Sequence, residues 1–365
     1  MASVASPKGA FSESYGEARA RFLEAARSAG AALHAYEHPA AKGPGGEALY
    51  LDVALLGPAG APRILAACSG THGIEGYSGS AAQSAFLASA PRLARGCALA
   101  FFHANNPWGF AHRARVTEEN VDLNRNFVDH AKPYPANRAY AELHPIVTPR
   151  NWDEDALAAV FRDLDAFRAR VGEQAFSDAY NGGQYSHPDG LFFGGHRAQW
   201  ANTAFRAAVR AHLGRARQAA MIDLHTGIGP SLGHVFLCFD PPGSAPHERA
   251  RAWWGERAVN REGVTHKAVA KYQGLLIDAF RTMLPQADTM AIVVEFGTRP
   301  REDMQRANMA GRWLRYEGPK NPPLAARIHA DFIDAFYPRE ARWRAAVLEQ
   351  SRDILERGLK GLAAD

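Results

Sequence analysis

The stretch RILAACSGTHGIEGYSGSAAQSAFLASAPRLA, residues 63–94, decides the fold of this chain. Residues 63–70 form a short apolar run of the kind found in buried strands, and residues 81–94 have helical character. Between them lie His72 and Glu75, three residues apart and flanked by glycines. In open α/β sheets, ligands bind beyond the carboxyl ends of the strands. We therefore expect His72 and Glu75 to lie in a binding site at the end of a strand.

Other apolar runs predict further strands of the same sheet, at residues 49–57, 97–107 with an NP turn at its end, 219–227, 234–240 and 290–298. A GPAGAP turn separates the run at 49–57 from the run at 63–70, so these two are expected to form a hairpin or to lie side by side. Helical periodicity predicts an opening helix at about 12–32 with Ser12 or Ser14 as its cap, a helical stretch at 151–180, and C-terminal helices after about 325. The expected fold class is α/β with three layers, a central mixed and mostly parallel sheet flanked by helices, in a single domain of residues 1–365.

Composition argues against several classes of function. The net charge of +4 comes from 42 Lys and Arg against 38 Asp and Glu, so nucleic-acid binding is not expected. No apolar window approaches the roughly 20 residues of a membrane span, so no membrane partner is expected either. Cys68, Cys97 and Cys238 lie in apolar stretches without CxxC spacing. They are expected to be buried thiols, which with the lack of a signal-peptide pattern favours a cytoplasmic location.

His72, Glu75 and the distant His225 in MIDLHTG supply the side chains that a catalytic zinc ion needs. Two neutral imidazoles and one carboxylate leave a fourth position open for water, and they leave the ion enough positive charge to polarise a carbonyl. HxxE alone is a weak signal, because a histidine and a glutamate often occur at this spacing by chance. A histidine in such a turn can also be structural and make only a hydrogen bond. The prediction of one zinc ion per chain therefore depends on the motifs that accompany HxxE.

These further motifs follow the order found in zinc carboxypeptidases: Asn106-Pro107, Arg115, the string DLNRNF at residues 122–127, His225, and Glu295 in VVEFGT. Over about residues 65–300 the chain thus resembles the zinc carboxypeptidase (metallocarboxypeptidase A-like) family. The resemblance implies that family's fold, its zinc ion and a hydrolytic activity. More narrowly, FSESYGEAR (11–19), SGTHGIEGYSGSAAQ (69–83) and GQYSHPDGLFFGG (183–195) resemble a bacterial branch with no assigned substrate. More distantly, the HxxE, DLNR and DLH strings resemble aspartoacylase and succinylglutamate desuccinylase.

The resemblance implies that Glu295 is the general base and that Arg115 stabilises the oxyanion. A carboxylate in the apolar run AIVVEFG is costly unless it is paired or functional, and apolar walls raise its pKa toward a useful value. The structural alternative is a strand-end glutamate paired with Arg299 or Arg301. A guanidinium stays charged and offers directed donors, which suits an oxyanion. Spacing to DLNRNF favours Arg115 over the nearby Arg113.

The resemblance also implies the residues that bind the substrate. Asn124 and Arg125 match the pair that grips a substrate carboxylate, where a bidentate fork gives affinity and orientation. Tyr272 in KYQG is expected near the substrate. Asp122 matches a position that hydrogen-bonds the first histidine, and Asp223 shares a strand face with the histidine two residues later. Either aspartate could fix an imidazole tautomer, or it could only cap a turn or a strand end.

Two other features of the sequence are interpreted as structural. Tyr185, His187 and His196 lie in a glycine-rich loop at 181–196 and are expected to pack or to form the rim of a pocket. GPSLG at 229–233 spells the GxSxG of serine hydrolases, whose nucleophile elbow needs a strand directly before the serine and a helix directly after it. Here Pro230 precedes Ser231 and a strand-like run follows, so a serine hydrolase is not expected.

The motifs together predict a zinc-dependent hydrolase that cleaves an amide bond next to a carboxylate. The favoured reaction is that of a metallocarboxypeptidase, and the alternative is deacylation of a small N-acyl amino acid, as in aspartoacylase-like enzymes. A second alternative is a protein of the same fold that binds its ligand without turnover. The expected partner is accordingly a small peptide or an N-acyl amino acid. The sequence indicates neither the side-chain preference nor the oligomeric state.

Overall fold

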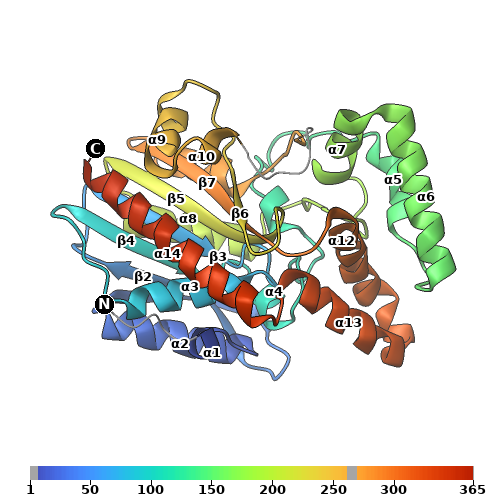
Figure 1. Cartoon of the computed structure of the whole chain (residues 1–365), viewed down its shortest axis with the longest axis horizontal. Helices are drawn as coiled ribbons and strands as arrows, with labels where there is room; N and C mark the ends of the chain where they lie inside the picture. Colours follow the sequence, from blue (N-terminus) through green and yellow to red (C-terminus); the bar gives the residue numbers. More distant parts are fainter. Residues whose placement is uncertain (1–6, 261–268, 365) are drawn as a thin grey trace.

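The computed structural model describes residues 7–260 and 269–364 of the chain. In these ranges the centre of the molecule is a seven-stranded sheet with the order β1-β2-β4-β3-β5-β7-β6 (Figure 1). The strands are β1 (Ala32–Lys42), β2 (Ala48–Leu56), β3 (Arg63–Ser69), β4 (Cys97–His103), β5 (Gln218–Gly227), β6 (His234–Leu237) and β7 (Asp288–Gly297). The central strands β4, β3, β5 and β7 are parallel, and the pairs β1 with β2, β2 with β4 and β6 with β7 are antiparallel. The predicted α/β class with a mixed central sheet is confirmed.

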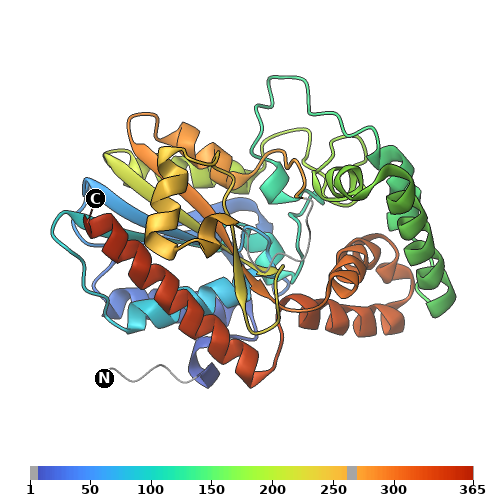
Figure 2. The same ribbon diagram turned by 45° about the horizontal axis from the view of Figure 1, so that its top comes forward.

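Helices cover both faces of the sheet and complete the three layers (Figures 1 and 2). One face packs against α2 (Tyr15–Ser28), α3 (Gly76–Ala88), α9 (Ala245–Trp254) and α14 (Ala341–Ala364). The other face packs against α8 (Trp200–Leu213) and α11 (Leu276–Met283). Shorter elements are α1 (Pro7–Ala10), α4 (Pro107–Ala111), η1 (Leu123–Arg125), α10 (Arg257–Asn260) and η2 (Gly318–Lys320). In the described ranges, no helix combines the length and the apolar character needed to cross a membrane.

Strand β3 shows why this sheet needs a helical layer on each face. Leu65 and Ala67 pack in the core on the α3 side, whereas Ile64, Ala66 and Cys68 pack in the core on the α8 side. Successive side chains of a strand point to opposite faces, so a strand that is apolar throughout must be covered on both. The continuous apolar runs of the sequence thus produce a buried sheet that is open only at the ends of its strands.

A helical lobe lies beside the sheet rather than over it (Figures 1 and 2). It consists of α5 (Tyr140–Val147), α6 (Glu154–Val171), α7 (Glu173–Asn181), α12 (Arg301–Tyr316) and α13 (Pro322–Phe336). Leu143, Leu164, Phe176 and Met309 belong to one apolar cluster that joins α5, α6 and α7 to α12. Because α12 begins shortly after the carboxyl end of β7, the lobe faces the strand ends where a ligand is expected.

The structure corrects the expected strand pairing. β2 and β3 neither form a hairpin nor lie side by side, because β4 lies between them, antiparallel to β2 and parallel to β3. The opening helix is also shorter than expected. The Ser14 side chain accepts a hydrogen bond from the Glu17 N–H at its start, and the helix ends at Ser28. The residues that follow form the edge strand β1, whose largely exposed side chains give no apolar run in the sequence.

Candidate metal centre

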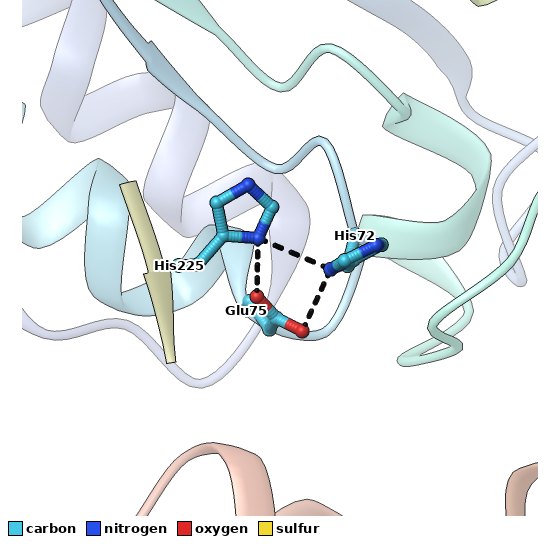
Figure 3. A group of neighbouring side chains, drawn as sticks. All are labelled: His72, Glu75 and His225. Atoms are coloured by element: carbon cyan, nitrogen blue, oxygen red, sulfur yellow. Dashed lines mark hydrogen bonds and ion pairs between the residues drawn. The ribbon is translucent and has the colours of Figure 1, made fainter. Parts of the chain in front are cut away.

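His72, Glu75 and His225 converge at the carboxyl ends of the central strands (Figure 3). His72 lies in the turn after β3, Glu75 lies at the start of α3, and His225 belongs to β5. Because β3 and β5 are neighbours in the sheet, their ends meet although the two histidines are 153 residues apart in sequence. The candidate ligand atoms lie within 4.8 Å of one another, and all three residues are buried. The three residues proposed as ligands from the sequence are therefore neighbours in the fold.

The spacing of these atoms fits a small divalent cation. Nδ1 of His72 lies 2.9 Å from Oε1 of Glu75, and Nδ1 of His225 lies 2.9 Å from Oε2 of the same carboxylate. The two Nδ1 atoms are 3.1 Å apart. Ligand atoms arranged as a tetrahedron at about 2.0 to 2.1 Å from zinc would be about 3.3 Å from one another. Two imidazoles and one carboxylate are also a donor set that catalytic zinc ions take, so these residues fit zinc.

A buried aspartate stands behind each histidine. Oδ1 of Asp122 lies 3.1 Å from Nε2 of His72, and Oδ2 of Asp223 lies 2.8 Å from Nε2 of His225. An Nε2–H that donates to a carboxylate leaves Nδ1 with its lone pair free for a cation. Thr71, which the sequence analysis did not single out, donates its hydroxyl to Oδ1 of Asp223 at 2.8 Å. Asp223 is thus placed to fix the tautomer and the ring orientation of His225, whereas Nε2 of His72 also lies 2.8 Å from Nη2 of Arg115.

Charge holds the carboxylates of the cluster in their ionised form. Burial alone would raise the pKa of Glu75, but His72 and His225 lower it below its usual value. Burial would likewise raise the pKa of Asp122, but the charge of His72 lowers it well below its usual range. For His225 burial favours the neutral ring, yet Asp223 raises its pKa well above the ordinary value. A cation that binds here would therefore displace a proton from the His225 imidazole.

Glu295 lies next to the cluster on the neighbouring strand β7, in register with His225. Its side chain is buried, and its Oε2 accepts a hydrogen bond of 3.2 Å from the Ile228 N–H. Burial raises the pKa of Glu295 to about 7, because the charged form loses hydration. The arginines considered as its structural partners pair elsewhere, Arg299 with Asp334 and Glu340 and Arg301 with Glu173. A carboxyl group with this pKa can accept and return a proton near neutral pH.

Arg115 reaches the cluster, and Arg113 does not. Nη1 of Arg115 donates to Oε1 of Glu75 at 3.0 Å, and its Nε donates to Oδ2 of Asp122 at 3.2 Å. Arg113 instead donates to the backbone carbonyl of Glu13. Of the two arginines, Arg115 is thus the one whose guanidinium lies at the cluster, and its role stays a prediction.

Asn124 and Arg125 present hydrogen-bond donors to a cavity beside the cluster. The cavity has a volume of about 210 Å³, and both residues line it together with His72 and Glu295. The Leu276 N–H donates to Oδ1 of Asn124 at 2.9 Å, which leaves the Asn124 amide N–H groups for a ligand. Arg125 is 4% exposed and donates only to backbone carbonyls in the described ranges, and its Nε is buried without a partner. Such a guanidinium is suited to an incoming carboxylate.

The remaining walls of this cavity are mainly apolar on the sheet side. Leu237, Phe239, Leu275 and Val293 line it there. Tyr272 lies at the same wall, with the Arg125 guanidinium 4.8 Å from the centre of its ring. On the opposite side the helical lobe contributes polar residues that the sequence analysis did not predict, among them Ser177, Asn181 and Asn308. Their sequence context offers no motif, because they reach the site only through the packing of α7 and α12.

The residues interpreted as structural have structural partners. The Tyr185 hydroxyl donates to the Arg125 carbonyl at 2.6 Å, and His196 Nε2 lies 2.7 Å from the Tyr185 carbonyl oxygen. His187 packs on the ring of His144. Ser231 is exposed in a turn that leads into β6, and no helix follows it, so it is not part of a nucleophile elbow. The three cysteines are free and buried, as the sequence analysis predicts.

Comparison with known proteins places this chain in one family, whose model covers most of its length. A family model described as "Protein of unknown function (DUF2817)" matches residues 11–350. No protein with a curated description matches the sequence.

Solved structures with a similar fold include proteins of the kinds that the motifs resemble. Bovine thrombin-activatable fibrinolysis inhibitor is 12% identical, with 94% of this chain and 99% of that chain covered at a TM-score of 0.44. The carboxypeptidase A from Helicoverpa armigera is 14% identical, with 87% and 73% covered at a TM-score of 0.42. A succinylglutamate desuccinylase from Silicibacter sp. is 12% identical, with 80% and 66% covered at a TM-score of 0.38. At these identities and TM-scores, the similarity bears on neither substrate nor reaction.

Proposed function

The chain belongs to the DUF2817 family of proteins of unknown function, and we propose that it is a zinc-dependent hydrolase that cleaves an amide bond next to a carboxylate. The favoured reaction is that of a metallocarboxypeptidase, which releases a C-terminal amino acid. The observation that supports it most is that one cavity is lined by His72 of the metal centre, by the buried carboxyl group of Glu295 and by Arg125. A metal ligand, a base and an anchor for a carboxylate are the parts that this reaction needs.

Arg125 and Asn124 bind and orient the substrate. The guanidinium of Arg125, whose Nε has no hydrogen-bond partner in the described ranges, and the amide of Asn124 take the substrate carboxylate, since both offer N–H donors to the cavity. A carboxylate held at that point places the adjacent amide bond toward Arg115 and Glu295, which line the same cavity. A carboxylate held by two charged or polar donors gives both affinity and a fixed direction of approach.

The chemical step divides between three kinds of group. His72, Glu75 and His225 would hold a zinc ion, which when bound would supply the Lewis acidity that activates water and the carbonyl. Glu295 accepts the proton of the attacking water and returns it to the leaving nitrogen, a role suited to a pKa raised to about 7. Arg115 offers its guanidinium to the negative charge that develops on the carbonyl oxygen, and Asp122 holds that guanidinium in place.

The apolar wall predicts which amino acid is released. Leu237, Leu275 and Val293 belong to the large apolar core on one face of the sheet and continue it into the cavity. A side chain that enters there leaves water for an apolar surface, which favours aliphatic or aromatic groups by about 1.5–3 kcal/mol each. The proposed substrate therefore carries an apolar side chain next to its carboxylate.

Deacylation of an N-acyl amino acid is the alternative reaction, because it uses the same anchor, base and cation. The two reactions differ only in whether the acyl part is a peptide or a small acid. A binding protein without turnover is the other alternative, and the intact base Glu295 argues against it.

A substrate screen tests the proposal. Zinc-loaded protein is incubated with peptides that end in leucine or phenylalanine and with N-acyl derivatives of the same amino acids, with and without a chelator. We expect release of the free amino acid that the chelator abolishes and that amidation of the terminal carboxylate prevents. Release that survives removal of the metal would contradict the proposal, as would the absence of release from every compound.

A further inference from the structure

A second cavity adjoins the cavity of the candidate active site. It has a volume of about 250 Å³ and shares Arg115, Phe192 and Asn308 with the first cavity. Arg125 and Glu295 line the first cavity and do not line the second. The second cavity therefore continues the site beyond Arg115, away from the carboxylate anchor. We call it the arginine cavity.

The arginine cavity gathers basic side chains among apolar ones. Its wall contains four arginines and two histidines, which are Arg113, Arg115, Arg312, Arg315, His112 and His329. No aspartate or glutamate is found among the described residues that line it. A concentration of positive charge without acidic side chains raises the local concentration of anions.

Two of these arginines have no carboxylate partner in the described ranges. Arg113 donates to the backbone carbonyl of Glu13, and Arg315 donates to the backbone carbonyl of Glu118. The carboxylates of those glutamates point elsewhere, Glu118 to His38 at 3.1 Å and Glu13 to other arginines at 3.6 and 3.7 Å. Arg312 differs, because Asp189 neutralises it at 3.1 Å. Arg113 and Arg315 thus carry charges that the neighbouring side chains leave uncompensated.

Apolar side chains lie beside these half-buried charges. Trp108, Leu191, Leu314 and Phe332 are among the residues that form the same wall. The Arg315 guanidinium lies 5.7 Å from the centre of the Trp108 ring, which holds it in place from one side. In such surroundings the attraction between an arginine and an anion is stronger than at an exposed surface.

Asn308 lies where the two cavities meet. Its Oδ1 atom is buried and has no hydrogen-bond partner among the described residues. A free acceptor at this point suits an N–H group of a ligand that passes from one cavity to the other.

We propose that the arginine cavity binds the acyl part of the substrate and that this part carries a carboxylate. This inference rests on the proposed function and narrows its substrate class. The substrates are then amides with an anionic group on each side of the bond that breaks: the α-carboxylate at Arg125, and a second carboxylate at Arg113 and Arg315. Either a dicarboxylic acyl group or an acidic residue of a peptide supplies the second carboxylate.

Binding to a protein that does not turn over its ligand tests this directly. The host is the zinc-loaded Glu295→Gln variant, and the probes are N-glutaryl-leucine and N-pentanoyl-leucine, which differ in one carboxylate. By calorimetry we expect the glutaryl compound to bind at least about 10-fold more tightly, the effect of one charge-assisted hydrogen bond or more. N-acetyl-glutamyl-leucine, compared with its glutamine counterpart, reports whether an acidic peptide residue is accepted as well.

Variants in the same host locate the effect. Arg315→Gln and Arg113→Gln keep a donor for the backbone carbonyls, and together they should remove the preference for the glutaryl compound. Arg315→Lys in place of Arg315→Gln keeps the positive charge and should restore part of the preference for the glutaryl compound. Arg306→Gln on the same helix is the matched control, because Arg306 is exposed and lines neither cavity. Equal binding of the two probes, no binding of either, or a preference that survives the double variant would overturn the proposal.

The same compounds separate this proposal from the proposed function. If the glutaryl compound is preferred in binding but no amide is hydrolysed by the wild-type protein, the arginine cavity stands and the hydrolase proposal fails. If both probes bind equally and are hydrolysed with the same kcat/KM, the hydrolase proposal stands and the arginine cavity does not bind an anionic acyl group.

Discussion

Glu295 lies directly opposite His225 in the register of the parallel strands β5 and β7. Residues paired in this way point to the same face of a sheet, so the backbone ladder itself sets the proposed base beside a proposed zinc ligand. The position of Glu295 does not depend on a loop. The same placement buries its carboxyl group and raises its pKa to about 7.

Replacing the proposed base should separate metal binding from turnover. Glu295→Gln keeps the shape and the hydrogen bond to the Ile228 N–H through its amide oxygen, but it cannot accept a proton. We expect an unchanged zinc content and a kcat at least about 100-fold lower. The matched control is Glu302→Gln, an exposed position at the start of α12, which should have wild-type kcat. A Glu295→Gln variant of normal activity would assign the base elsewhere.

The pH dependence of the reaction should follow Glu295. A general base works as a carboxylate, so kcat/KM should rise as the pH rises through its pKa. Burial sets that pKa at about 7 without a metal, and a nearby cation lowers it because it favours the carboxylate. The rising limb, measured from about pH 5 to about pH 9, should therefore have its midpoint below 7 and should be lost in Glu295→Gln. A rate that falls over this range, or a limb unaffected by the substitution, would count against the assignment.

The aspartate behind His225 should tune the affinity for the metal. Asp223→Ala removes the acceptor of the Nε2–H, so the ring loses its fixed tautomer and part of its basicity. Zinc affinity measured by competition with a chelator should fall by about 10- to 100-fold. Asp240→Asn is a control for buried aspartates in general, since Asp240 pairs with Arg281 away from the cluster. Equal affinity in Asp223→Ala and wild type would show that Asp223 only stabilises the strand end.

Arg125 should discriminate between substrates with and without a terminal carboxylate. Arg125→Ala is expected to lower kcat/KM for a carboxylate substrate by about 10- to 100-fold, the effect of losing a charged hydrogen-bonding pair. The amidated form of the same substrate should lose little, which provides an internal control for misfolding. For the carboxylate substrate, the kcat/KM of Arg125→Lys should lie between those of the wild type and Arg125→Ala. Lysine keeps the positive charge but cannot form the two parallel hydrogen bonds of a guanidinium. Equal losses on both substrates would refute the anchor.

Most of the candidate site could be predicted from the sequence because its residues follow strands or lie in them. His72 comes directly after an apolar run, and His225 and Glu295 lie within two others. Buried parallel strands end at a common edge, so chain positions far apart are brought together by a simple rule. The order of the motifs indicates which residues are the proposed ligands, and the common edge of the strands indicates where they lie.

What could not be predicted depends on contacts between distant segments. Nothing in the run at 49–57 indicates that β4 would come to lie between β2 and β3, because adjacency in a sheet is set by the whole topology. Likewise Asn308 and Arg315 belong to an amphipathic helix. From the sequence alone, polar residues in such a helix are expected on its solvent-exposed face. Only the packing of the helical lobe against the strand ends brings these residues to the wall of the arginine cavity.

The central claim is that His72, Glu75 and His225 bind one zinc ion, and metal analysis tests it most directly. The protein is stripped with a chelator, reconstituted with zinc, freed of excess metal and measured by elemental analysis next to His72→Ala, His225→Ala and, as a control, His247→Ala on α9. We expect about one zinc per chain in the wild type and in His247→Ala, and almost none in His72→Ala and His225→Ala. Wild-type protein that retains no zinc, or ligand variants that retain as much as the wild type, would contradict this claim.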